Sequence, residues 1–209
     1  KKAMASMSAI LGDPDRIHAI AKDFVEHYEE RVTEGSTVAG KAMFVSSSRA
    51  IAYQLYQELQ VLRPAWFDQL DCAEGETLTD KERDELKPSE RVRMVMTRNK
   101  DDEKTLWDVI GTKDDRKDLD RQFKQAKSNF KIAIVVDMWL TGFDVPFLDT
   151  MYIDKPLKSH TLMQTIARAN RVHKDKNNGL IVDYIETYEA LLEALAIYGD
   201  SDNKGGAAG

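Results

Sequence analysis

A short apolar run near the middle of the chain limits the possible folds more than any other feature. Residues 132–136 read Ile-Ala-Ile-Val-Val, with no polar residue on either alternating face. A run this short and this rich in β-branched residues is typical of a strand buried on both faces of a parallel sheet. Four further strand-like runs occur at residues 41–45, 91–96, 150–154 and 179–183.

Segments with helical periodicity separate these runs. Asp13 and Pro14 are typical of a helix start, and the helix that follows is predicted to end before Gly35. Two more helices are predicted after Ser48 and around Leu119. Strands that alternate with helices predict an α/β fold with five strands in a mostly parallel sheet.

The residues that follow the central run carry the most specific motifs. Residues 141–146 read Thr-Gly-Phe-Asp-Val-Pro, and about twenty residues later come Gln164, Arg168 and Arg171. The two arginines are three residues apart, so on a helix they share one face and can converge on one anion.

These segments resemble motifs V and VI of superfamily-two helicases and translocases. The sequences of residues 135–146, 167–172 and 179–184 point to a narrower group within that superfamily. They resemble the motor (R) subunit of type I restriction enzymes. Three separated motifs agree in order and spacing. The resemblance covers nearly the whole chain, but only the second motor domain of that much larger subunit.

The resemblance implies a RecA-like three-layer α/β/α sandwich with helical extensions at both ends. It assigns residues 1–36 to the connection from the first motor domain, 37–185 to the second RecA-like domain, and 186–209 to the start of a helical region with a disordered tail.

The resemblance also implies roles at a nucleotide site. Arg168 and Arg171 are expected to be arginine fingers for the γ-phosphate of ATP, because arginine is always charged and binds phosphate oxygens in a bidentate way. Gly142, Asp144 and Gln164 are expected to lie at the nucleotide. ATP and Mg²⁺ are the cofactors of the full-length subunit, and no Mg²⁺ ligand is predicted in this chain.

A second set of residues is expected to bind the DNA backbone. Ser46 and Ser47 follow the first strand and precede a helix, as in helicase motif IV, and Thr97 follows the second strand. Ligands gather at the carboxyl ends of such strands. The alternatives are that Ser48 is only an N-cap and that Thr97 only caps a helix.

The residues of motifs V and VI also have plainer interpretations. Arg168 and Arg171 could form surface salt bridges, and Asp144 could cap a turn. Ala167 stands where the wider superfamily usually has glycine. Val136 stands where related helicases often have a phosphate-binding threonine. This difference weakens the hypothesis that motif V itself binds DNA.

Two segments imitate different kinds of site. Residues 35–41 approach a Walker A motif, but a helix precedes them, a strand follows, and Ala42 replaces the Mg²⁺-binding Ser or Thr. Residues 85–87 and 102–104 each imitate half of an acidic-x-Lys nuclease motif within strongly polar stretches, so they are interpreted as surface.

Composition and charge limit the class of protein and the compartment that this sequence fits. The 209 residues carry a net charge of −6, which argues against an independent nucleic-acid binder. Charge is uneven, because residues 155–176 hold six lysines and arginines against one aspartate. Cys72 is the one cysteine, which excludes an internal disulfide and fits a reducing cytoplasm. No apolar run is long enough to cross a membrane.

The predicted function is therefore that of a motor fragment within an ATP-dependent DNA translocase and endonuclease. Its expected partners are double-stranded DNA, the first motor domain, and the methylase and specificity subunits. The chain lacks true Walker A, Walker B and nuclease motifs, so alone it is predicted neither to hydrolyse ATP nor to cleave DNA. The alternatives are another superfamily-two DNA or RNA helicase, and a non-catalytic α/β module that binds a protein partner.

Overall fold

The computed structural model describes most of the chain, and describes side chains from residue 5 onward. The described residues are 2–140, 143–158, 161, 164–165, 167 and 179–185.

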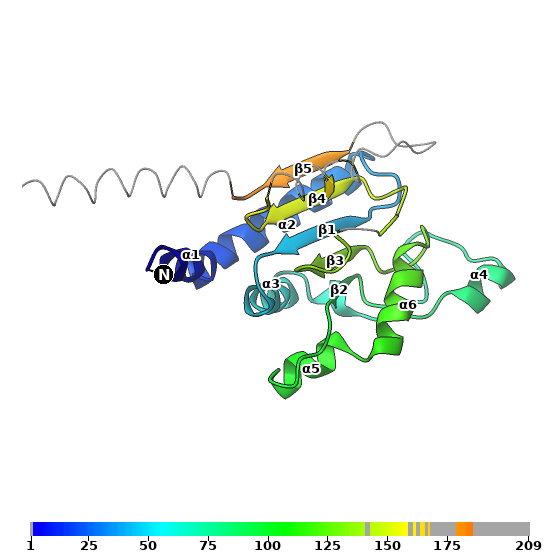
Figure 1. Ribbon diagram of the computed structural model, residues 1–209. Coiled ribbons are helices and arrows are strands. Elements are labelled where there is room, and N and C mark those ends of the chain that lie inside the picture. Colours follow the sequence, from blue (N-terminus) through cyan, green and yellow to red (C-terminus); the bar gives the residue numbers. More distant parts are fainter. Residues whose placement is uncertain are drawn as a thin grey trace, which may run out of the picture.

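Within these residues, one five-stranded sheet has the order β2-β3-β1-β4-β5, and every pairing is parallel (Figure 1). The predicted α/β class and the five predicted strands are confirmed, and the sheet is parallel throughout rather than mostly. The strands are β1 (Ala42–Ser46), β2 (Val92–Val95), β3 (Ile132–Val135), β4 (Thr150–Asp154) and β5 (Leu180–Asp183).

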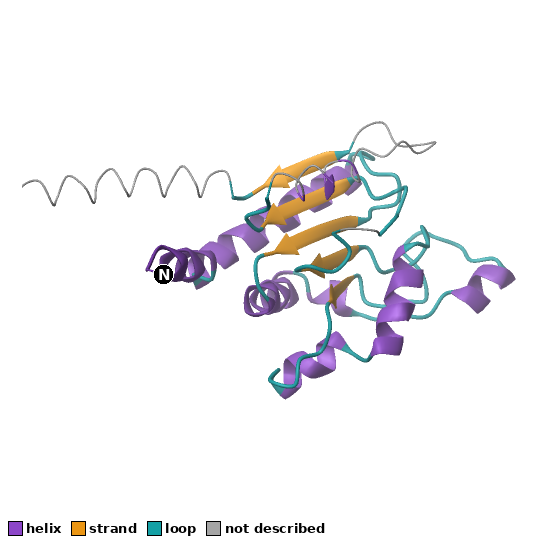
Figure 2. Ribbon diagram, in the orientation of Figure 1, coloured by secondary structure: helices purple, strands orange, loops and turns teal. Residues whose placement is uncertain are grey.

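Helices cover both faces of the sheet (Figure 2). On one face, α2 (Pro14–Thr33) and α3 (Arg49–Leu62) pack against alternate strand residues such as Phe44. On the other face, α6 (Lys113–Phe123) packs against Met43 and Val45. This is the expected three-layer sandwich. The remaining helices are α1 (Lys2–Leu11), η1 (Pro64–Phe67), α4 (Asp80–Glu85) and α5 (Lys104–Ile110).

The start and end of α2 are as the sequence predicts. The Asp13 carboxylate accepts hydrogen bonds from the backbone N–H groups of Asp15 and Arg16 at 3.0 and 3.1 Å, and Pro14 opens the helix. The helix ends just before Gly35, which has a φ of +70°. Six of its residues are buried and belong to the same core as β1, so this helix is packed into the domain.

Candidate functional site

The carboxyl ends of the five strands lie at one edge of the sheet, because the strands are parallel. Open α/β sheets bind ligands at this edge. The strand register brings Val45 of β1 level with Val135 of β3 and Ile153 of β4. The polar residues at the ends of these three strands therefore lie side by side. They include Ser46, the last residue of β1, and Ser47.

Ser46 and Ser47 have buried hydroxyls that make no hydrogen bond to any described residue. Ser46 is fully buried, and the hydroxyl oxygens of both serines are out of contact with solvent. A buried hydroxyl without a partner costs free energy, so such a group calls for an explanation. Ser48 differs, because its side chain accepts a hydrogen bond from the Ile51 N–H at 3.2 Å and caps α3. The N-cap alternative for Ser48 is confirmed.

Thr97 lies exposed two residues beyond the end of β2. Its hydroxyl makes a weak contact of 3.8 Å with the Met138 sulfur, and its carbonyl accepts a hydrogen bond from Arg49. Thr97 caps no helix, because α5 starts at Lys104 with Glu103 as its N-cap. Its hydroxyl is therefore available to a ligand.

Arg49 fixes the loop that holds Thr97. It pairs with Asp102, whose side chain is only 7% exposed. The prediction that residues 102–104 are all surface was wrong for Asp102. Burial opposes its charge, but hydrogen bonds from Arg49 and the Asn99 N–H outweigh burial and lower the pKa of Asp102.

The motif V loop has a strained backbone. Trp139 has a φ of +68° and, within the described part of the chain, is the one non-glycine residue with a positive φ. A bulky residue with this φ is unusual and marks a turn or a functional constraint. The Trp139 ring stacks on Phe143 with centroids 4.0 Å apart and 3° between the planes. Asp144 is exposed on the same loop, and Gly142 lies outside the described residues.

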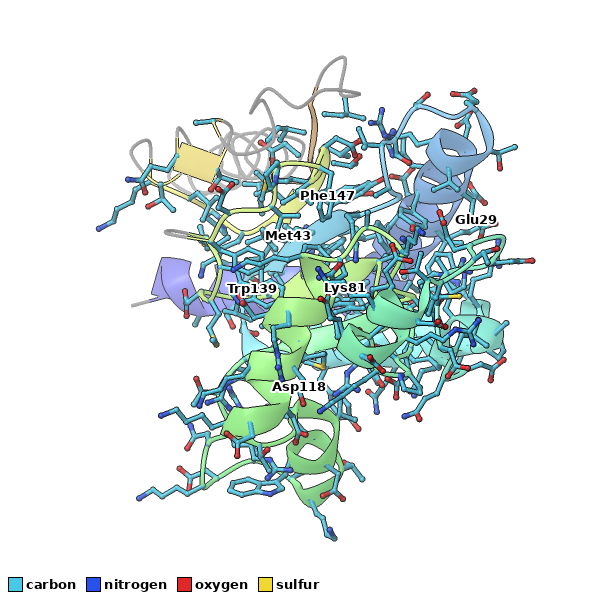
Figure 3. All side chains as sticks on the ribbon, turned by 90° about the vertical axis from the view of Figure 1, so that its right-hand side faces the viewer. Glu29, Met43, Lys81, Asp118, Trp139 and Phe147 are labelled. Carbon is cyan, nitrogen blue, oxygen red and sulfur yellow. The ribbon has the colours of Figure 1, made fainter. Side chains whose placement is uncertain are left out.

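A groove of about 660 Å³ lies between this loop and α6. Figure 3 looks onto this side of the molecule and shows Trp139 beside α6, which carries Asp118. Four of the seven lining residues are basic: Lys113, Arg116, Lys117 and Arg121. One lining residue, Asp120, is acidic, so this basic groove has more positive than negative lining residues, and Lys117 and Arg121 also pair with Asp114 and Asp118 of α6.

Little of motif VI is described. Arg168 and Arg171 lie outside the described residues, so their expected role stays a prediction. Gln164 and Thr165 have helical backbone, as expected for this segment, and Gln164 is half-buried. The Thr165 hydroxyl donates to the Thr161 carbonyl at 2.8 Å.

Sequence reasoning missed two charged residues at the end of β4. Asp154, whose side chain is 1% exposed, pairs with Arg16 of α2, which also donates to the Leu11 carbonyl. Lys155 reaches across the sheet edge, where it donates to the Val136 carbonyl at 2.9 Å and pairs with Asp137. The signal in the sequence was a charged pair at the end of a buried strand.

The opposite edge of the sheet holds the residues that imitate Walker A. Lys41 is fully buried, and its ammonium donates to the carbonyls of Phe130 and Gln122 at 2.6 and 3.2 Å. Burial lowers the pKa of Lys41, and Lys131 lowers it further. This lysine is a structural group at the amino end of β1, which confirms that residues 35–41 are not a P-loop.

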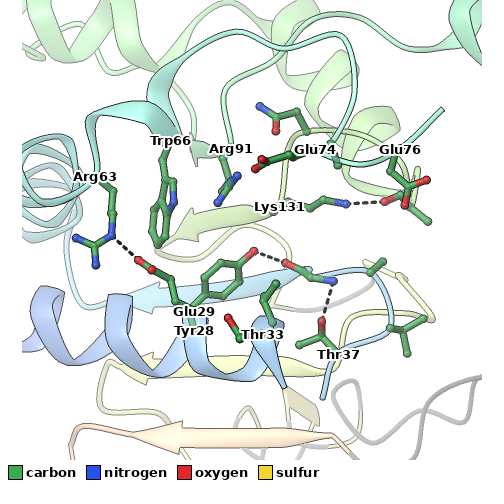
Figure 4. Close-up of a pocket in the computed structure, with 17 residues that line it drawn as sticks. Tyr28, Glu29, Thr33, Thr37, Arg63, Trp66, Glu74, Glu76, Arg91 and Lys131 are labelled. Carbon is green, nitrogen blue, oxygen red and sulfur yellow. Dashed lines mark hydrogen bonds and ion pairs between the residues drawn. The ribbon is translucent and has the colours of Figure 1, made fainter. Parts of the chain in front are cut away.

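A pocket of about 530 Å³ lies beside it (Figure 4). Its walls carry equal numbers of acidic and basic side chains. These are Glu29, Glu74, Glu76, Arg63, Arg91 and Lys131. Glu29 and Arg63 form an ion pair. A pocket with balanced charge has no strong preference for phosphate.

Known proteins share the sequence pattern of this domain. A family model described as type I restriction enzyme subunit R domain 3 matches residues 38–186. This chain belongs to that family. The type I restriction enzyme HindI endonuclease subunit of Haemophilus influenzae is 39% identical over 199 residues, which are 94% of this chain and 17% of that subunit. The MjaIXP endonuclease subunit of Methanocaldococcus jannaschii, described as a putative one, is 38% identical over 205 residues, 98% of this chain and 17% of that protein.

Solved structures share the fold of this R-subunit domain. A fragment from Vibrio vulnificus YJ016, described as a putative HsdR subunit of a type I restriction enzyme, has a TM-score of 0.50 at 15% identity, covering 82% of this chain and 28% of that chain. T4 UvsW also has a TM-score of 0.50 at 15% identity, covering 88% and 28%. The chain spans 17% of the length of the two curated relatives, so what a whole R subunit does can only be proposed for it.

The described residues lack two further kinds of feature. None of their helices is both long and apolar enough to span a membrane. No three of their His, Cys, Asp or Glu side chains come together as metal ligands would.

Proposed function

We propose that this R-subunit domain is half of a DNA motor, which moves double-stranded DNA past the enzyme before cleavage. The observation that carries the proposal is the carboxyl edge of the sheet. There the buried hydroxyls of Ser46 and Ser47, which bond to no described residue, occur on the edge that also carries Thr97 and the basic groove. Hydroxyls and cations are the groups that position a protein on DNA phosphates.

In the full-length subunit, the nucleotide site is proposed to lie between this domain and the first motor domain. ATP with Mg²⁺ supplies the free energy of the cycle. The Mg²⁺ ligands are assigned to the first domain, because this sequence has no true Walker A or Walker B motif. This chain is proposed to supply Arg168 and Arg171 toward the γ-phosphate, with Gly142, Asp144 and Gln164 beside the nucleotide.

The motor cycle then follows from which groups each state brings together. Closure of the two domains places Arg168 and Arg171 on the γ-phosphate, and hydrolysis removes the charge that holds them. Ser46, Ser47 and Thr97 bind the DNA backbone in one state and release it in the other. Sequence recognition is assigned to the specificity subunit, because backbone contacts carry no sequence information.

Two alternative functions differ from this proposal in the nucleic acid and the nucleotide that they would need. Another superfamily-two DNA or RNA helicase would share the fold, so the fold alone does not exclude it. A partner-binding α/β module would need neither ATP nor nucleic acid. The family match over residues 38–186 favours the restriction-enzyme motor over both.

The test is ATP turnover by the full-length subunit assembled with its methylase and specificity subunits. The proposal expects turnover that requires double-stranded DNA and is not supported by RNA of equal length. The isolated chain is expected to show no turnover above background. RNA-stimulated turnover would favour the helicase alternative, and DNA-independent or absent turnover would contradict the motor proposal.

A further inference from the structure

The end of β4 carries a cation that the proposed DNA contacts do not use. We propose that Lys155 binds a phosphate of DNA, and that its ammonium is paired with Asp137 when no DNA is bound. The inference rests on the proposed function, because it adds a contact to the same DNA-binding edge. Three observations support it: where the ammonium lies, what it binds and what lies beneath it.

The position of Lys155 follows from the strand order. β1 lies between β3 and β4, and Lys155 comes directly after β4. Its ammonium nevertheless bonds to the carbonyl of Val136, directly after β3, at 2.9 Å. Neighbouring strands are about 4.8 Å apart, so this side chain crosses the end of β1 to reach its acceptor. It therefore passes over the segment that holds Ser46 and Ser47.

The contacts of Lys155 leave it able to bind more. An ammonium has three N–H groups, and within the described residues Val136 and Asp137 account for two of them. The Lys155 side chain is 18% exposed, so part of it can be reached from solvent. Val136 supplies only its carbonyl, because its side chain is a buried hydrocarbon. Residue 136 thus contributes no hydroxyl at the end of β3.

Asp137 is a weak partner. Its side chain is 84% exposed, and an ion pair with so exposed a carboxylate is worth little in water. A phosphate oxygen that reaches this edge of the sheet can therefore replace Asp137 at the ammonium with little loss. The result is a charge-assisted contact from one lysine to one phosphate, which is a common way for a protein to bind the DNA backbone.

The test measures how salt affects binding of non-specific double-stranded DNA to the full-length subunit, assembled with its partners. Replacing Lys155 by Met removes the charge and keeps the aliphatic chain. One lost phosphate contact should make the slope of log affinity against log salt shallower by about 0.9. Affinity should fall by about tenfold at low salt. The control is Lys87→Met. Lys87 lies before β2, away from this edge, and its ammonium pairs with Asp118 of α6.

A second variant separates a phosphate contact from a structural role. Asp137→Asn frees the ammonium, so DNA binding should tighten by about two- to fivefold. In the Lys155→Met background the same change should have no effect. Lys155→Arg should keep the wild-type slope, because it keeps the charge.

Three results would overturn the inference. They are an unchanged slope in Lys155→Met, a loss of DNA affinity that only follows a fall in melting temperature, and an equal gain from Asp137→Asn in both backgrounds. Each leaves the motor proposal standing if the wild-type enzyme still shows DNA-dependent ATP turnover. If the wild-type enzyme binds no DNA, the proposed function itself fails.

Discussion

At the scale of single residues, a buried ion pair stabilises one contact between a helix and the sheet. Asp154 lies at the carboxyl edge with a side chain only 1% exposed. Burial raises the pKa of Asp154, while hydrogen bonding and charge attraction from Arg16 oppose that rise. The pair joins α2 to the end of β4, so it ties the first long helix to the edge where the proposed ligands bind.

Asp154→Ala should lower the free energy of unfolding by about 3 kcal/mol, because it leaves the largely buried Arg16 charge without its carboxylate. Glu29→Ala is the matched control, since its pair with Arg63 is 41% and 40% exposed on the two sides. That change should cost less than about 1 kcal/mol. Urea unfolding of both variants measures the difference, and equal losses would show that burial does not govern these pairs.

Two lysines make stability depend on pH. Burial lowers the pKa of Lys131 to about 8 and lowers that of Lys41 as well. The unfolded chain, where a lysine has a pKa of about 10.4, therefore binds more protons between about pH 8 and pH 10. The free energy of unfolding should rise across this window, by up to about 1.4 kcal/mol per pH unit for each proton. Above about pH 10 the trend should reverse, because burial raises the pKa of Tyr56 to about 12.

Urea unfolding from about pH 7 to pH 10 checks this expectation. Lys131→Met should flatten the rise, whereas Lys87→Met, which removes an exposed lysine, should leave it intact. A flat profile in the wild-type chain would mean that Lys131 is not desolvated as its burial implies.

At the scale of elements, caps fix the helix that borders the basic groove. The Thr112 hydroxyl accepts a hydrogen bond from the Asp115 N–H at 3.1 Å, and the Asp115 carboxylate accepts one from the Thr112 N–H at 2.6 Å. Gly111 precedes this cap with a φ of +76°, where a Cβ atom would meet the Asp115 carboxylate at 2.9 Å. The start of α6, and with it Lys113 and Arg116, is therefore set by three residues.

Thr112→Ala should lower the free energy of unfolding by about 1 kcal/mol, because it removes one half of the capping box. Thr112→Ser keeps the hydroxyl and should stay within about 0.5 kcal/mol of the wild type. Thermal or urea unfolding distinguishes the two, and a similar loss in both would point to packing of the threonine methyl rather than to the cap.

The periodicity of apolar residues predicted the strands and helices that bury a full face in the core. It missed short helices that bury few residues or none. The five strands and α2 came from runs of apolar residues with one clear period. By contrast, α5 buries just Leu106 and Ile110, and α4 buries no residue at all, so neither leaves a clear pattern. The carboxyl-edge position of Thr97 followed from parallel pairing alone.

The rest of the site could not be predicted, because it depends on distance in space. Lys155 meets Val136 across the end of β1, and Asp102 is covered by Arg49 from a different element. Neither contact has a local signature in the sequence.

At the scale of the whole molecule, the domain has two edges of different character. The amino edge holds Lys41, which is a structural group, and a pocket whose balanced charge gives it no strong preference for anions. The carboxyl edge holds the Ser46 and Ser47 hydroxyls, a strained loop and a basic groove. Our central claim is that this second edge completes an ATP-driven DNA motor together with a domain outside this chain.

The measurement that tests this claim most directly is DNA-stimulated ATP turnover by the full-length subunit, assembled with its partner subunits, with Arg171→Ala compared with wild type. Arg83→Ala, which removes an exposed arginine of α4 outside the proposed sites, is the control. Loss of an arginine finger should lower turnover by about a thousandfold or more while the protein stays folded. An unchanged rate in a folded Arg171→Ala enzyme would contradict the claim that this residue completes the ATP site.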